Sequence, residues 1–214
     1  MKKIMFNDRF GLTQAVLDGR KTQTRRLASR FLPDAVRIGY ARFEIANGRE
    51  LRCWTKGTSF IKFNLPYKVG EAVAISQSYK ELDYLPLALN RSPKDWRTVS
   101  QPPTLGQSKG WNNKMFVRSE ACKHHISITN VRIERLQEIS DEDCLKEGIY
   151  PYYGDEEEKK FYEIPPNGYS FDGTDFHYPT PREAFSHLID KVSGKGTWER
   201  NPYVFVYDFE LVKP

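Results

Sequence analysis

The segment from Phe10 to Arg26 constrains the fold more than any other part of the chain. Leu12, Ala15 and Val16 recur at helical spacing, which predicts a short amphipathic helix with one apolar face. Gly19 follows at the position where a helix end commonly requires a positive φ angle. The residues after this glycine alternate between long polar side chains and threonine, which favours strands. The sequence therefore predicts a helix, a glycine stop and a strand in immediate succession.

The predicted strand is dense in charge. Four cations lie within the eight residues that begin at the glycine, namely Arg20, Lys21, Arg25 and Arg26. Strict alternation places Lys21 and Thr24 on opposite faces of a strand, so these two side chains converge only if the chain bends just after the glycine. Such a strand suits an anionic or polar ligand. It equally suits a solvated sheet edge, because edge strands often carry Lys and Arg.

Composition indicates a folded protein with an uneven charge distribution. Of the 214 residues, 14% are aromatic and 29% charged, which is typical of a globular chain, and no linker separates two cores. We therefore expect a single domain over residues 1–214. Residues 1–30 carry eight Lys or Arg against two Asp or Glu, whereas residues 141–163 carry nine acidic residues against three Lys. The basic end coincides with the strand above, where we expect a polyanionic partner.

Several function classes are excluded by what the sequence lacks. The three cysteines, Cys53, Cys122 and Cys144, lie far apart and form neither a CxxC pair nor a zinc set with the four histidines. No apolar run approaches the length of a membrane span, and the first residues lack the apolar core of a signal peptide. We expect a cytoplasmic protein with no metal, no cofactor and no membrane partner.

Turn and capping signals place the remaining elements. An Asn47-Gly48 pair between alternating runs predicts a hairpin over residues 42–54 with a type I′ turn. Helices are expected after the capping residues Ser140 and Thr180. Further strands are expected at 72–76, 125–136 and 203–211. The mixture predicts an α+β fold in which two long loops, at about 81–113 and 151–180, are insertions.

Three parts of the chain resemble ASCH domains, a branch of the PUA-like superfamily whose longer members occur in bacteria and their phages. They are the Gly-Arg-Lys-Thr-x-Thr-x-Arg run at 19–26, the strand-then-helix segment at 131–149, and the closing segment at 198–206, which contains Trp and Asn-Pro-Tyr-Val. The resemblance implies a mostly antiparallel β-barrel with covering helices. Both predicted insertions fall outside the minimal domain of this family.

The resemblance also implies a site. The family includes a bacterial amidohydrolase that removes the acetyl group from N4-acetylcytidine, and its catalytic set falls on Lys21, Thr24 and Glu147. A threonine hydroxyl needs an adjacent base, and a lysine serves only if burial or neighbouring cations lower its pKa. Glu147 would orient the lysine or protonate the leaving amine. A carboxylate near a helix C-terminus opposes the helix dipole, which favours a cation partner such as Lys21 or Arg26.

The ligand is expected to lie in a basic cleft. Tryptophans at 54, 111 and 198 offer faces for base stacking, although most tryptophans belong to cores, and Trp111 is the best candidate for the rim. The residues expected to contact the ligand are Arg20, Arg25, Arg26, Trp111 and Lys114.

Three functions fit these observations. The first is binding of RNA or a nucleotide-like ligand in the basic cleft. The second is an amidohydrolase that deacylates a modified nucleoside such as N4-acetylcytidine. The third is a phage-related module that binds another protein. RNA binding should weaken steeply with salt because phosphate contacts release counterions, whereas nucleoside hydrolysis should not. The sequence leaves the exact ligand and the oligomeric state open.

Overall fold

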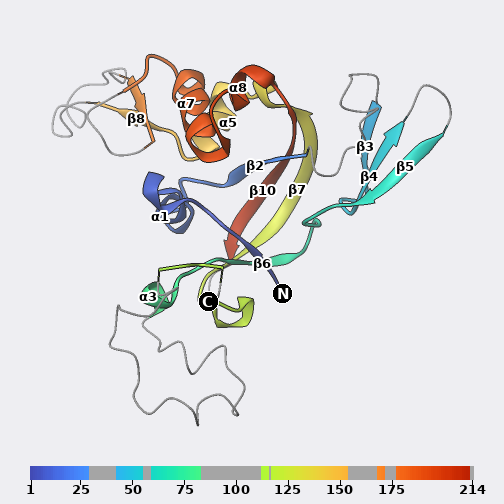
Figure 1. The fold of residues 1–214 in the computed structure, drawn as a ribbon, viewed down its shortest axis with the longest axis horizontal. Coiled ribbons are helices and arrows are strands. Elements are labelled where there is room, and N and C mark those ends of the chain that lie inside the picture. Colours follow the sequence, from blue (N-terminus) through green and yellow to red (C-terminus); the bar gives the residue numbers. More distant parts are fainter. Residues whose placement is uncertain are drawn as a thin grey trace, which may run out of the picture. The chain divides into compact units, whose positions relative to one another are not determined.

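The computed structural model has an α+β fold, drawn in Figure 1. The structure describes residues 1–28, 42–54, 59–82, 112–115, 117–153, 168–171 and 177–212. The chain divides into two compact units. The first comprises Met1–Phe6, Ala72–Ser127 and Leu211–Pro214, and the second comprises Asn7–Glu71 and Ile128–Glu210.

The first unit is built around a short sheet. Its strands are β1 (Lys2–Ile4), β6 (Ala72–Ile75) and the first residues of β7 (His125–Arg135), and β6 pairs in parallel with β1 and antiparallel with β7. The helices α3 (Tyr79–Leu82) and η3 (Ser119–Ala121) belong to the same unit.

Two contacts hold this unit together. Tyr79, Leu82 and Val117 are buried in one apolar cluster beside the sheet. The Lys3 ammonium donates hydrogen bonds to the backbone carbonyls of Lys114, Met115 and Val117, which ties β1 to that segment.

The second unit contains the rest of β7, the strand β10 (Tyr203–Val212) as far as Glu210, and β2 (Gln23–Leu27), in the order β7-β10-β2. β2 and β10 are antiparallel, with Gln23 opposite Asp208 and Thr24 opposite Tyr207. Four consecutive residues of β10, Val204 to Tyr207, are buried. A run buried on both faces explains why β10 reads as continuously apolar instead of alternating.

The helix–glycine–strand prediction is confirmed in the second unit. The helix α1 (Leu12–Leu17) buries Leu12, Ala15 and Val16, and Gly19 has a φ of 75°. The backbone N–H of Lys21 then bonds back to Ala15, so the chain bends before β2 begins. This bend frees the Lys21 side chain from the strict alternation of the strand.

Helices gather at one end of the β7-β10-β2 sheet (Figure 1). These helices are η4 (Leu136–Glu138), α5 (Asp141–Lys146), α7 (Pro181–Ser193) and α8 (Thr197–Arg200), and η1 (Asp8–Phe10) precedes α1. The predicted caps are confirmed, because the hydroxyls of Ser140 and Thr180 accept hydrogen bonds from the N–H groups of Asp143 and Glu183.

The second unit also holds two small antiparallel sheets. One is β3 (Arg42–Ala46), β4 (Glu50–Trp54) and β5 (Phe60–Asn64), and the other is β8 (Tyr150–Tyr152) with β9 (Gly168–Ser170). Asn47 and Gly48 both have positive φ, at 53° and 61°, as the predicted type I′ turn requires. The strand β5 was not predicted, because its apolar residues show no clean alternation.

Parts of the sequence predictions are not tested by the described residues. The predicted insertions at 81–113 and 151–180 lie largely outside them. Within the described segments the strands form open sheets and no closed barrel is found. The prediction of one domain over 1–214 stays a prediction beside the two compact units. Among the described helices, none combines the length and the apolar character needed to cross a bilayer.

Candidate functional site

A buried ion pair joins the start of β2 to the end of α5. The Lys21 Nζ lies 2.6 Å from the Glu147 Oε2 and 2.7 Å from the backbone carbonyl oxygen of the same residue. The two residues are only 2% and 4% exposed. Glu147 caps the C-terminus of α5, where carbonyl groups lack partners within the helix. One ammonium therefore satisfies both the carboxylate and the helix end, and the expected cation partner of Glu147 is Lys21.

Burial changes the acidity of this lysine. Desolvation lowers the pKa of Lys21 below its ordinary value of 10.5 and outweighs the opposing effect of the Glu147 carboxylate. The nearby charges of Arg26 and Arg25 lower the pKa further. The direction is the one that a lysine needs to act as a base near neutral pH.

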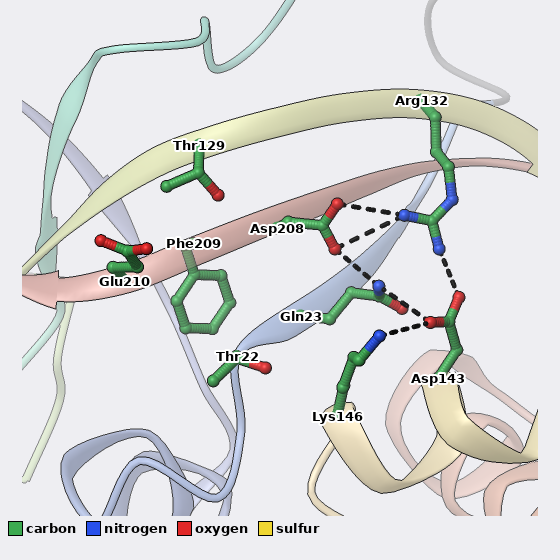
Figure 2. A pocket seen from close by; sticks show the side chains of 9 residues that line it. All are labelled: Thr22, Gln23, Thr129, Arg132, Asp143, Lys146, Asp208, Phe209 and Glu210. Carbon is green, nitrogen blue, oxygen red and sulfur yellow. Dashed lines mark hydrogen bonds and ion pairs between the residues drawn. The ribbon is translucent and has the colours of Figure 1, made fainter.

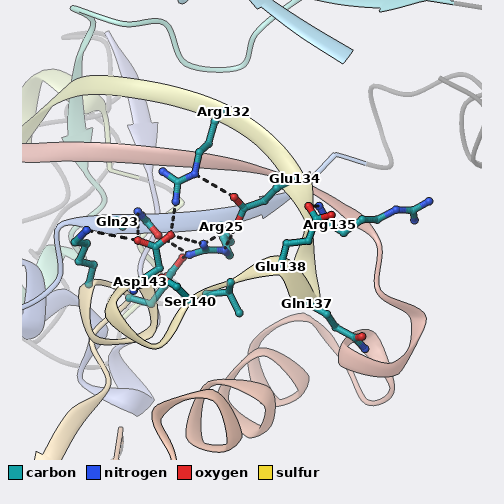
Figure 3. Close-up of polar contacts among 12 residues, drawn as sticks. Gln23, Arg25, Arg132, Glu134, Arg135, Gln137, Glu138, Ser140 and Asp143 are labelled. Carbon is teal, nitrogen blue, oxygen red and sulfur yellow. Dashed lines mark hydrogen bonds and ion pairs between the residues drawn. The ribbon is translucent and has the colours of Figure 1, made fainter. Parts of the chain in front are cut away.

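Arg25 connects this pair to a wider network of carboxylates. Its guanidinium lies 2.7 Å from Glu134, 2.9 Å from Asp143 and 3.2 Å from Glu147, and its side chain has no exposed surface. Figure 3 shows Arg25 meeting Glu134 from β7 and Asp143 from α5. The Gln23 Oε1 accepts a further hydrogen bond from Arg25 at 2.5 Å. A buried guanidinium with this many acceptors is fixed in position.

Asp143 is the residue that this network shares with an open cleft. It accepts hydrogen bonds from Arg25, Arg132 and Gln23, and it lies 3.5 Å from the Lys146 ammonium. Burial alone would raise the pKa of Asp143, but the hydrogen bond from Arg25 and the charges of Arg132 and Arg25 outweigh it and lower the pKa below 3.8. Asp143 is therefore ionised across the physiological pH range.

The cleft has a volume of about 460 Å³, and all the residues that line it belong to the second unit. Figure 2 shows their side chains. It is lined by Thr22, Gln23, Thr129, Arg132, Asp143, Lys146, Asp208, Phe209 and Glu210. Arg132 spans the cleft between two carboxylates, with its Nη1 at 3.1 Å from Asp208 and its Nη2 bonded to Asp143. The Gln23 Nε2 donates to the same two residues, at 2.6 Å to Asp208.

The exposed groups around this fixed centre can bind a ligand. Thr22 and Thr129 offer hydroxyls, Lys146 a cation and Glu210 a carboxylate, and all four residues are exposed. With three carboxylates and two cations the cleft is mixed in charge instead of basic. This arrangement can hold a small molecule that carries both hydrogen-bond donors and acceptors.

The catalytic residues expected from the sequence are placed as follows. Lys21 and Glu147 meet, and Arg25 joins them. Thr24 is 4% exposed and points, by strand alternation, to the opposite face of β2 from Gln23 and Arg25. The three expected catalytic residues are all buried, and none of them lines the cleft.

The expected ligand contacts are dispersed. Arg20 is exposed, pairs with Asp18 at 3.2 Å and lies over the Tyr150 ring. Arg26 is partly buried on the Thr24 side of β2. Lys114 belongs to the first unit, where it lies 3.7 Å from Glu81. Trp111 lies outside the described residues.

Four residues at the centre of the cleft were missed by sequence reasoning, namely Gln23, Arg132, Asp143 and Asp208. Gln23 alternates with Lys21 and Arg25 in the sequence, and that signal could have found it. Asp143 lies in the first turn of α5, where acidic residues are common in any helix, so its position gave no signal of a site. Asp208 reaches the site because β10 pairs with β2 in one particular register, which no local pattern shows.

No three His, Cys, Asp or Glu residues in the described segments are placed to share a metal ion. All three cysteines are buried and free, and burial raises the pKa of Cys53 to about 11 and that of Cys144 to about 12.

Comparison of the chain with models of protein families, with curated proteins and with solved structures returns no match.

Proposed function

We propose that the second unit binds a small nucleotide-like ligand in the cleft centred on Arg132. The observation that carries this proposal is a 460 Å³ cleft in which ion pairs hold the centre rigid while four exposed polar residues remain at its walls. Small-molecule sites of about 300–1,000 Å³ are typical, and a few fixed polar groups orient the ligand in them.

The charges favour a small ligand over a long polyanion at this site. Lys21 is paired with Glu147, Arg25 with three carboxylates, and Arg20 with Asp18. A buried cation that already has carboxylate partners is not available to a phosphate, and of these three cations only Arg20 is exposed. The basic run at 19–26 therefore supports the architecture of the cleft more than it supports a groove for an RNA backbone.

The nucleotide-like character of the ligand rests on the resemblance to ASCH domains. The run at 19–26 supplies β2 and the Lys21 side of the ion pair, and the segment at 131–149 supplies Arg132, Asp143 and Glu147. We propose on this basis that the β7-β10-β2 sheet belongs to a PUA-like barrel. We also propose a reducing compartment such as the cytoplasm, because the sequence contains only three cysteines and they lie far apart.

A binding titration tests the proposal. Isothermal titration of the full chain with cytidine, N4-acetylcytidine and cytidine monophosphate should give saturable binding. The affinity should change little between about 50 and 200 mM salt. Over the same range, a ligand held by several phosphate contacts would lose about one order of magnitude or more in affinity through counterion release. Glu210→Gln should weaken binding, because it removes a charged acceptor from the wall. Glu199→Gln, an exposed change outside the cleft, is the control. Absence of binding by all three ligands, or equal loss in both variants, contradicts the proposal.

A second candidate function is hydrolysis of an acylated nucleoside. The specific observation in its favour is the lowered pKa of Lys21, bonded to Glu147 at 2.6 Å. In this reaction a hydroxyl attacks the amide carbonyl, the lysine takes the hydroxyl proton, and the amine leaves with a proton. Water then cleaves the ester and releases the acid. Thr24 is assigned to the attack by resemblance alone, whereas Thr22 lines the cleft.

Substitution can show whether the hydroxyl of Thr22 or that of Thr24 is the nucleophile. Thr22→Val and Thr24→Val each replace a hydroxyl with a methyl group, and release of cytidine from N4-acetylcytidine is followed by chromatography. Loss of turnover in one variant identifies the nucleophile. Thr129→Val, which also removes a hydroxyl from the cleft wall, should retain turnover. Equal rates in all three variants, or no turnover in the parent chain, would remove this function.

A further inference from the structure

The sheet β3-β4-β5 of the second unit carries a surface that takes no part in the cleft. In its register, Arg42, Trp54 and Phe60 lie directly opposite one another, and the next row on the same face is Glu44, Arg52 and Lys62. Residues opposite one another in an antiparallel sheet project to the same side, as do residues two apart along a strand. These six residues are called the β3–β5 face below.

The opposite side of this sheet anchors it. Leu51 and Cys53 are fully buried there, and the Phe43 ring lies 4.6 Å from the Tyr203 ring of β10. One side of the sheet is thus packed into the second unit, which explains why the β3–β5 face is the more exposed side.

Two aromatic rings lie at the centre of the β3–β5 face. The Trp54 and Phe60 centroids are 4.6 Å apart, and Phe60 is 36% exposed. Two cations approach the Phe60 ring, with the Arg52 guanidinium carbon at 5.4 Å and the Lys62 ammonium at 5.8 Å from its centroid. An exposed ring flanked by cations is a surface on which another flat π-system can stack.

The cations of this face remain available to an anion, unlike those of the buried network. Arg52 lies 3.9 Å from Glu44, and Lys62 lies 4.0 Å from Glu50, so both ion pairs are long. The Lys62 side chain is 57% exposed. Exposed pairs of this kind contribute little to stability, so a phosphate can displace the carboxylates.

We propose that the β3–β5 face binds single-stranded nucleic acid. A base would stack on Phe60 beside Trp54, and Arg42, Arg52 and Lys62 would contact the neighbouring phosphates. The strand must be single, because bases in a duplex are already stacked and present no free face. This inference is independent of the nucleotide-like ligand proposed for the cleft.

Fluorescence anisotropy with a labelled twelve-nucleotide oligouridine tests the proposal on the full chain. Phe60→Leu keeps the residue apolar but removes the stacking face, and binding should weaken by about 5- to 100-fold. Three phosphate contacts should give a slope of about −2 in a plot of log K against log salt, and Lys62→Gln should reduce that slope by about 0.7.

Matched controls accompany both variants. Ile61→Thr changes the next residue of β5, which is 45% exposed and projects to the opposite side, and it should leave binding unchanged. Lys195→Gln removes an exposed cation elsewhere. Circular dichroism of Phe60→Leu checks that the sheet is intact, and Arg42→Gln provides a second test if it is not.

Several results would overturn the inference. These are absence of oligouridine binding, equal affinity for a duplex of the same length, or an affinity unchanged by both Phe60→Leu and Lys62→Gln. Self-association that Phe60→Leu abolishes would instead assign the face to a second copy of the chain. Glu210→Gln should leave oligouridine binding unchanged and Phe60→Leu should leave nucleoside binding unchanged, so failure of one proposal is distinguishable from failure of the other.

Discussion

At the scale of single residues, the most informative group is the buried trio of Lys21, Arg25 and Glu147. Removing a charge from water costs several kcal/mol, and a buried pair recovers this only with good geometry and further hydrogen bonds. Here the Lys21 ammonium has two oxygen partners on Glu147, and Arg25 bonds three carboxylates. The trio is therefore satisfied as a unit, and the loss of one member leaves the others buried without full compensation.

Lys21→Met should consequently destabilise the protein by about 3–5 kcal/mol, because it leaves part of the Glu147 carboxylate and the end of α5 without a donor. Urea unfolding measures the change in the free energy of unfolding. Lys146→Met removes a lysine whose side chain is 51% exposed and should cost less than about 1 kcal/mol. A loss below about 1 kcal/mol for Lys21→Met would show that the buried pair contributes little.

Two glycines with positive φ distinguish the stability cost of backbone strain from that of a steric clash. Gly48 and Gly70 have φ angles of 61° and 79°, where a side chain costs about 1–2 kcal/mol. A Cβ atom at Gly48 would clash with the Val69 side chain, whereas nothing lies within 4 Å of one at Gly70.

Gly48→Ala should therefore destabilise more than Gly70→Ala, and urea unfolding of both variants gives the difference. Equal losses would mean that Val69 moves aside freely and that the hairpin turn tolerates the extra atom.

At the scale of elements, the helix α5 links stability to the cleft. Ser140 caps its first turn through the N–H of Asp143, and the Asp143 side chain lies in the cleft. Glu147 ends the same helix and holds Lys21. The helix α5 therefore positions the Asp143 carboxylate in the cleft and the Glu147 carboxylate in the buried trio. Fraying at either end of α5 should weaken ligand binding.

Ser140→Ala should cost about 1 kcal/mol of stability and should also weaken ligand binding in the cleft, because the first turn of α5 loses its cap. Thr180→Ala removes the equivalent cap of α7 and should cost a similar amount. Thermal unfolding and the nucleoside titration are measured on both variants. Equal effects on binding would show that α5 has no special connection to the cleft.

At the scale of the whole molecule, carboxylates with lowered pKa values control stability in acid. The pKa of Asp143 is lowered despite burial, chiefly by Arg25, and that of Asp190 by hydrogen bonds from the backbone, beginning with Trp198. A carboxyl group with a lower pKa in the folded state contributes stability that is fully present above its unfolded pKa, near 3.9. That stability is lost as the pH falls from this value through the folded pKa.

The unfolding temperature of the parent chain should therefore fall steeply below about pH 4. The Asp143→Asn variant should be less stable than the parent chain at pH 7, but it should lose less stability as the pH is lowered. Calorimetry between pH 2.5 and 7 follows both chains, with Asp141→Asn, an exposed change in the same helix, as the control. Parallel pH curves for Asp143→Asn and the parent chain would exclude Asp143 as a source of the acid dependence.

Local features of the fold were predictable because they depend on neighbours in sequence. The caps at Ser140 and Thr180, the turn at Asn47 and Gly48, and the stop at Gly19 each depend on the conformation of a few adjacent residues. The strand β5 was missed, because its residues are partly exposed on both sides of a small sheet and show no alternation. The ASCH-type barrel stays a prediction, since the described strands form open sheets.

Local sequence patterns predicted several elements and the charges on them: a basic strand behind a glycine, a carboxylate at a helix end, and a cation partner such as Lys21 or Arg26 for Glu147. Tertiary packing buries Lys21 and Arg25 against carboxylates and forms an open cleft beside them around Arg132 and Asp208. The reason is physical. Capping and turn energies act over a few residues, whereas the burial of a charge and its choice of partner depend on which distant strands and helices pack together.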